Sequence, residues 1–86
     1  MKYERLLMAL ELVRSEIILN NFILTKHAWL RMTERNVTRL DIVECVRHGL
    51  AFVEEEKFHF VGYDSEGLKL KVICVYNDAT LIITVF

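Results

Sequence analysis

One histidine and two arginines are spaced so that they could act together on a phosphate. His27, Arg31 and Arg35 are four residues apart, and residues at that spacing form a stripe along one edge of a helix. An imidazole can donate or accept a proton near neutral pH, and guanidinium groups bind phosphate oxygens and stabilise developing charge. The three residues are therefore candidate catalytic groups for RNA cleavage. On spacing alone, a solvated helix edge is the better interpretation.

The stripe also needs a compensating negative charge. Arginines four residues apart repel each other on an exposed helix, so we expect Glu34, a carboxylate such as Glu54 or Glu55, or an anionic ligand nearby. Two lysines on a predicted strand, Lys69 and Lys71, are candidate phosphate contacts for substrate binding. They would share a sheet face with Thr84 and apolar residues, a mixture that also fits an ordinary half-exposed sheet.

No pattern indicates a metal or a cofactor. The three histidines are not at ligand spacing, and the acidic residues Glu54, Glu55 and Glu56 would alternate between the two faces of a strand. No glycine-rich phosphate loop is present. Cys45 and Cys74 are isolated among apolar residues, so we expect buried free thiols.

The composition favours one small folded domain over residues 1–86. Hydrophobic residues make up 53% of the chain, Pro is absent and Gly occurs three times, which excludes disorder and leaves no linker. The formal net charge of −1 argues against nucleic-acid binding through bulk electrostatics. Charged residues interrupt every long apolar run, so we expect no signal peptide, no membrane contact and a cytoplasmic location.

The first predicted element is an amphipathic helix over residues 2–19, within an N-terminal segment 1–20. Its apolar side chains recur at intervals of three and four residues, but Ile17, Ile18 and Leu19 make the last turn apolar all round. A helix end of that kind must be covered. Burial under the rest of the domain is the preferred interpretation, and a dimer or partner contact is the alternative.

A pair of helices is predicted over residues 25–49. Thr25 can cap the first helix, and Asn36 can adopt the left-handed conformation that ends it. Thr38 begins the second helix, with an acid, Asp41, at the third helical position. Gly49 is expected to end that helix as a C-terminal cap.

From residue 50 onward the apolar period changes to two, which predicts an antiparallel meander over residues 50–86. Strands are expected over residues 51–57, 58–63, 68–76 and 80–86, the first two being either one bent strand or two. The short turns at 64–67 and 77–79 require antiparallel neighbours. In the last strand Leu81, Ile83 and Val85 would face one way and Ile82, Thr84 and Phe86 the other. The predicted fold class is α+β, with N-terminal helices followed by an antiparallel sheet of three to four strands.

The helix pair carries a recognisable motif. Residues 25–38 fit the pattern T-x-H-A-x-x-R-M-x-x-R-x-I/V-T/S, which resembles the signature of a prokaryotic domain-of-unknown-function family, number 4258, in the RelE/ParE-like toxin superfamily. The resemblance implies a RelE/ParE-like fold and a toxin-like component of a toxin–antitoxin system that acts as an mRNA endoribonuclease without metal. Its implied partners are a cognate antitoxin protein and RNA, and its implied catalytic residues are His27, Arg31 and Arg35. The alternative is a non-catalytic binding or regulatory module that acts through protein–protein association, including a homodimer.

Overall fold

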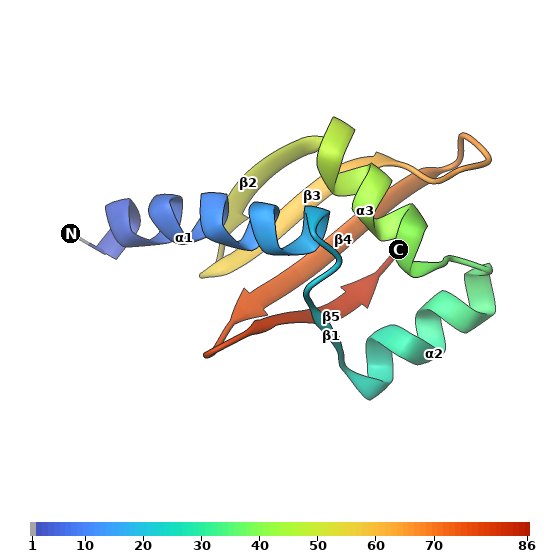
Figure 1. Ribbon diagram of the computed structural model, residues 1–86, viewed down its shortest axis with the longest axis horizontal. Coiled ribbons are helices and arrows are strands. Elements are labelled where there is room, and N and C mark those ends of the chain that lie inside the picture. The colour runs from blue at the N-terminus through green and yellow to red at the C-terminus, as the bar shows by residue number, and fades with distance from the viewer. Residues whose placement is uncertain (1) are drawn as a thin grey trace.

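Three helices and five strands follow one another along residues 2–86, the part of the chain that the computed structural model describes. The elements in chain order are α1 (Lys2–Ile18), β1 (Ile23–Leu24), α2 (Lys26–Arg35), α3 (Arg39–His48), β2 (Leu50–Glu54), β3 (Lys57–Tyr63), β4 (Lys69–Tyr76) and β5 (Thr80–Val85). Helices α1 and α3 lie across one face of the sheet, and α2 lies beside β5 (Figure 1). The predicted α+β class is confirmed.

The sheet differs from the prediction in strand number and direction. Its five strands are ordered β1-β5-β4-β3-β2, and β1 runs parallel to β5 while all other neighbours are antiparallel. The expected antiparallel sheet of three to four strands is therefore wrong: the sheet is mixed. Strand β1 has only two residues, Ile23 and Leu24, which is too short for a period to indicate pairing. It is held by Thr25, whose N–H donates to Ile82 O at 3.1 Å.

A tight turn divides residues 50–63 into two strands. Glu54 pairs with Lys57, so only Glu55 and Glu56 connect β2 to β3. Both connecting residues have positive φ, 52° and 61°. Two-residue hairpins favour this conformation because its twist matches that of the strands, although it normally selects Asn and Gly. Residues 50–63 therefore form two strands rather than one bent strand. The turn that joins them places two glutamates in a left-handed conformation that glutamate disfavours.

We expect Glu55→Asn to stabilise the protein. Asparagine tolerates the left-handed conformation better than glutamate, and the left-handed state costs about 1–2 kcal/mol for an ordinary residue. The free energy of unfolding, measured by urea denaturation, should rise by about 0.5–1 kcal/mol. Glu66→Asn is the matched control, since Glu66 is an exposed loop glutamate outside the positive-φ set. An equal or lower stability for Glu55→Asn would show that the turn is not strained.

The core lies between the sheet and helices α1 and α3. Helix α1 contributes Val13 and Ile17, α3 contributes Ile42 and Val46, and the sheet contributes the fully buried side chains of Phe60, Leu70, Val72, Cys74, Ile82 and Val85. At the end of α1, Ile17 is buried and Ile18 packs against the core, while Leu19 remains 77% exposed. The interpretation that the domain covers this helix end is confirmed for the two isoleucines, and Leu19 is the exception.

A bulge changes which residues of β5 face the core. Ile73 pairs with Thr84, but the next residue, Cys74, pairs with Ile82, so Ile83 is the extra residue. A bulge interrupts the two-residue alternation, and both Ile82 and Val85 therefore reach the core. The predicted division of β5 into strictly alternating faces is wrong. Ile83 instead accepts a 3.0 Å hydrogen bond from Thr25 Oγ1 through its carbonyl oxygen.

Candidate functional site

The face of the sheet opposite α1 and α3 carries aromatic, apolar and cationic side chains. Register and alternation from the buried positions assign its residues. We call this surface the open sheet face, and it comprises Leu50, Phe52, Glu54, Lys57, His59, Val61, Tyr63, Lys69, Lys71, Ile73, Val75, Leu81, Thr84 and Phe86. Several of its large side chains are strongly exposed, among them Leu50, Tyr63 and Phe86. An exposed sheet face of this composition is typical of an interaction surface.

Two rings are stacked on this face. Phe52 and His59 are cross-strand partners, and their ring centroids lie 4.9 Å apart at an interplanar angle of 10°. His59 is buried under this contact, and its Nδ1 has no hydrogen-bond partner within residues 2–86. Phe52 is 37% exposed. The pair therefore places one partly exposed aromatic ring, that of Phe52, in the middle of β2.

Both predicted phosphate-binding lysines lie on the open sheet face beside an aromatic residue. Lys69 is the cross-strand partner of Tyr63. Lys71 faces Phe86, with which it exchanges two backbone hydrogen bonds of 3.2 and 2.9 Å. Cross-strand neighbours of this kind have Cβ atoms about 5 Å apart. Each lysine thus combines a cation with a ring on the same surface.

Helix α2 brings one predicted catalytic residue to the margin of this face. Thr25 caps the helix as predicted, because its Oγ1 accepts from Ala28 N at 3.1 Å. Arg31 pairs with Glu34 at 3.6 Å, and its Cζ lies 5.9 Å from the centre of the Phe86 ring. The predicted compensation by Glu34 is confirmed. Arg31, Phe86 and Lys71 are therefore neighbours at one corner of the sheet.

The other two residues of the stripe lie differently. Arg35 is half-buried and donates from Nη2 to the backbone oxygen of Lys69 at 3.1 Å, while its Nη1 is buried without a partner among the described residues. Its guanidinium therefore ties α2 to β4. His27 is exposed in the first turn of α2, about 6 Å of helix rise before Arg31. Arg31 therefore contacts the open sheet face through the Phe86 ring, and Arg35 contacts β4 through a backbone oxygen. His27 is connected to that face only as part of the same helix.

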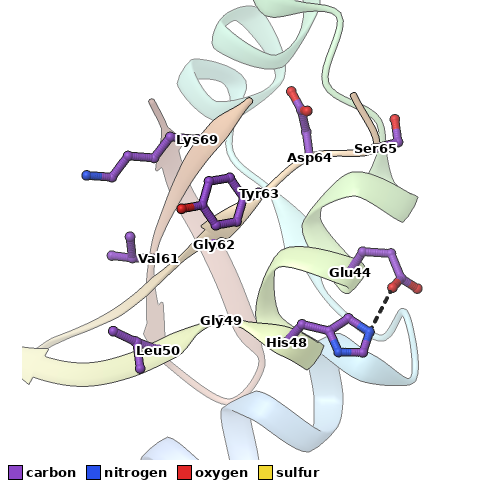
Figure 2. A pocket seen from close by; sticks show the side chains of 10 residues that line it. All are labelled: Glu44, His48, Gly49, Leu50, Val61, Gly62, Tyr63, Asp64, Ser65 and Lys69. Atoms are coloured by element: carbon purple, nitrogen blue, oxygen red, sulfur yellow. Dashed lines mark ion pairs between the residues drawn. The ribbon is translucent and has the colours of Figure 1, made fainter. Parts of the chain in front are cut away.

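A pocket of about 560 Å³ opens between the C-terminal turn of α3 and the β3–β4 hairpin. Glu44 and His48 line one side and Tyr63 and Lys69 the other, and Figure 2 shows the two α3 side chains directed toward each other. His48 Nε2 lies 3.2 Å from Glu44 Oε2. Sequence reasoning missed this pair, although the spacing of four residues within a predicted helix was a usable signal.

Two glycines allow α3 to approach β3 beside this pocket. A Cβ atom at Gly49 would lie 2.4 Å from both Cys45 O and Val61 O, and one at Gly62 would lie 2.9 Å from Cys45 O. Gly49 caps the end of α3 as predicted, with an extended backbone of φ −90° and ψ −179°. Glycine is needed there because the helix end and the strand are in backbone contact, a requirement that no local pattern signals.

Neither cysteine is suited to nucleophilic chemistry. Both thiols are free and buried, which confirms the prediction. Burial raises the pKa of Cys45 to about 11 and that of Cys74 to about 12, and only the thiolate is an effective nucleophile. Cys45 also donates to Leu70 O at 3.4 Å. The two side chains are core residues.

The described part of the chain contains neither a cluster of metal-binding side chains nor a membrane-spanning helix. Within residues 2–86 no group of three or more histidine, cysteine, aspartate or glutamate residues could hold a metal ion. Across the same residues, every helix is too short or too polar to cross a membrane.

Comparison with known proteins gives one match. Residues 24–86 match the family model of a domain of unknown function, DUF4258. No curated protein and no solved structure matches the chain. The matched range contains α2, α3, four complete strands and Leu24 of β1, and thus the whole open sheet face and the pocket, whereas α1 lies outside it.

Proposed function

The chain belongs to the DUF4258 family, and we propose that this member binds single-stranded RNA on its open sheet face as a toxin-like component of a toxin–antitoxin system. In this proposal the fold is RelE/ParE-like, the protein acts in the cytoplasm, and a cognate antitoxin protein neutralises it by covering the same face. One observation carries the proposal: aromatic rings and lysines are cross-strand neighbours on a sheet face that lies opposite α1 and α3.

Base stacking and electrostatic attraction to the phosphates are the two interactions by which proteins bind single-stranded RNA. Bases stack on exposed aromatic rings with about 1–3 kcal/mol per base, whatever their sequence. Phe52, Tyr63 and Phe86 offer such rings. Lys69 and Lys71 can hold the phosphates between successive bases. Local charge thus supports RNA binding even though the chain as a whole has a net charge of −1.

The same surface suits cleavage next to Arg31. His27 would accept the proton of a ribose 2′-hydroxyl as that oxygen bonds to the adjacent phosphorus. The 5′-oxygen would leave and take a proton from solvent, giving a 2′,3′-cyclic phosphate and a 5′-hydroxyl end. Arg31 and Lys71 would stabilise the charge that develops on the phosphate oxygens. Arg35 would contribute by holding α2 against β4.

Binding is tested with a fluorescein-labelled RNA 12-mer and fluorescence anisotropy. We expect Lys71→Glu to weaken binding at least tenfold and to flatten the dependence of log Kd on log salt, because a phosphate contact is replaced by a repulsion. Arg5→Glu changes the net charge equally on α1, away from the open sheet face, and should leave Kd within twofold. Equal effects of the two variants would contradict a local site on this face.

Cleavage is tested by induction in cells. We expect growth arrest and RNA degradation with the wild-type chain, and neither with His27→Ala or Arg31→Ala. RNA binding without cleavage would leave the binding surface in place and remove the catalytic part of the proposal.

A second candidate function rests on the outer side of α1. This helix exposes the large apolar side chains Tyr3, Leu7, Met8 and Leu12, and Leu19 just after its end is exposed as well, more than a solvated helix needs. The protein would then be a non-catalytic binding or regulatory module that associates through α1, as a homodimer or with another protein. Because Ile18 packs against the core, Leu12→Asp and Leu19→Asp are the informative variants. Light scattering that finds a monomer for wild type and both variants would exclude the homodimer.

A further inference from the structure

We propose that the pocket between α3 and the β3–β4 hairpin is a nucleotide-binding subsite that holds one nucleotide of the strand bound on the open sheet face. This inference rests on the proposed function and deepens it by assigning a site for a single base and its phosphate. Four features of the described residues support it: continuity, an unpaired strand edge, available charge and an exposed ring.

The pocket is continuous with the open sheet face. Leu50, Val61, Tyr63 and Lys69 belong to that face and also line the pocket. An RNA strand that runs along β3 and β4 on this face can therefore extend directly into the pocket. The volume of about 560 Å³ lies within the range of sites for nucleotide-sized ligands.

The pocket also lies where β3 loses its neighbour. Strand β2 begins at Leu50, which pairs with Val61, and the position opposite Tyr63 would be residue 48, which belongs to α3. The backbone N–H and C=O of Lys71 bond to Phe86 in the direction of β5. Backbone groups alternate in direction along a strand, so those of Leu70 point toward its partner Gly62 in β3. The N–H and C=O of the next residue, Tyr63, therefore point away from β4. These two groups can hydrogen-bond to the edge of a base as an added strand would.

The charged groups leave cations available to an anion. Glu44 is already paired with His48 at 3.2 Å and with Arg47 Nε at 3.8 Å. Asp64 Oδ1 accepts two backbone N–H groups, from Glu66 and Leu68, each at 2.9 Å. Lys69 forms no ion pair among the described residues, so its ammonium group is available to bind a phosphate.

His48 and Tyr63 complete the site. Since Nε2 of His48 is held by Glu44, Nδ1 is the ring nitrogen left for a ligand. Tyr63 is 65% exposed, and Figure 2 shows its ring between Lys69 and the α3 side chains. A base stacked on this ring would place its edge toward the Tyr63 backbone and its phosphate toward Lys69.

Chemical-shift mapping with ¹⁵N-labelled full-length protein tests the site. The probes are 5′-AMP, 5′-GMP, 5′-CMP and 5′-UMP in separate titrations, with inorganic phosphate as a further arm. At least one nucleotide should shift the amides of Gly49, Gly62, Tyr63 and Ser65 saturably, at millimolar concentrations or below. Equal shifts from phosphate alone would reduce the pocket to an anion site and overturn the proposal. So would nucleotide shifts confined to Phe52, Lys71 and Ile73.

Variants of the ring separate stacking from a structural effect. Tyr63→Leu should raise the Kd for the mononucleotide at least fivefold. Tyr63→Phe should leave this Kd within twofold of wild type because it keeps the ring. Tyr76→Leu is the matched control, since Tyr76 is a partly exposed strand tyrosine far along β4 from Lys69. If Tyr63→Phe bound as weakly as Tyr63→Leu, stacking would not be the cause and the assignment would fail.

The outcomes also distinguish this inference from the proposed function. Binding of the RNA 12-mer that responds to Lys71→Glu, with no mononucleotide shifting the pocket amides, overturns the subsite and leaves the RNA surface standing. A mononucleotide that shifts the pocket amides, with no binding of the 12-mer, supports the pocket as a nucleotide site but overturns the RNA surface, and with it the claim that the nucleotide belongs to a bound strand.

Discussion

Gly49→Ala is expected to lower the free energy of unfolding by about 3 kcal/mol. The added Cβ would lie 2.4 Å from two backbone oxygens, Cys45 O in α3 and Val61 O in β3. Neither atom belongs to a flexible side chain, so helix and strand must move apart and loosen the core between them. The hydrogen bond from Gly49 N to Cys45 O, 2.8 Å long, would be strained as well.

Urea denaturation followed by circular dichroism measures this effect. Gly67→Ala is the control: Gly67 has φ +80° but open space around it, so alanine there should cost about 1 kcal/mol through its conformation alone. A Gly49→Ala protein within 0.5 kcal/mol of wild type would contradict the close backbone contact. If the variant does not fold at all, Gly62→Ala should still fold and show a smaller loss of stability, because the closest approach there is 2.9 Å.

Asp41→Ala is expected to cost about 3 kcal/mol, because one buried carboxylate satisfies donors from two parts of the chain. The Asp41 carboxylate accepts from Thr38 N at 2.9 Å, and Asp41 N donates to Thr38 Oγ1 at 3.1 Å, so the two residues form a capping box at the start of α3. The carboxylate also accepts from Thr38 Oγ1 at 3.1 Å. It also accepts from Ser65 N at 2.9 Å. The substitution would thus remove the carboxylate half of the capping box and leave the Ser65 amide of the hairpin without its partner.

The Asp41 carboxylate also makes stability depend on pH. Burial raises the pKa of Asp41, but hydrogen bonds from Thr38 and Ser65 outweigh it and hold the pKa below its ordinary value. A group whose pKa is lower in the folded state stabilises the protein above its unfolded pKa, about 3.9. That contribution is lost as the pH falls through the folded pKa.

Asp41→Asn should therefore remove part of the acid sensitivity. The difference in unfolding free energy between wild type and Asp41→Asn should be largest at pH 5 to 7 and should shrink below pH 4. Asp78→Asn is the matched control, because Asp78 is exposed in a turn with φ 62° that asparagine also tolerates. A difference that stays constant from pH 7 to pH 2 would show that the carboxylate charge is not involved.

Much of the candidate site could be predicted from the sequence because its signals are local. The spacing of His27, Arg31 and Arg35 placed them on one helix, and the alternation around Lys69 and Lys71 placed both on one sheet face. The partners of these residues could not be predicted. That Arg31 lies over Phe86 while Arg35 binds the Lys69 carbonyl depends on how α2 sits against β4 and β5.

The sequence by itself determined the element order, the α+β class and the ends of the helix pair. Thr25, Asn36, Thr38 and Gly67 act through their own conformations and through bonds to residues three or four positions away, so a short window of sequence contains the cause. That both cysteines are buried free thiols could likewise be predicted from their apolar sequence neighbours.

Only the tertiary structure decided the pairing of β1, the bulge and the pocket. The two residues of β1 are a strand because β5 lies beside them, and Ile83 is a bulge because the pairing with β4 shifts there. Gly49 must be glycine because Val61, twelve residues on, comes into backbone contact. Each feature depends on atoms distant in sequence, and no period or cap encodes which distant atoms will meet.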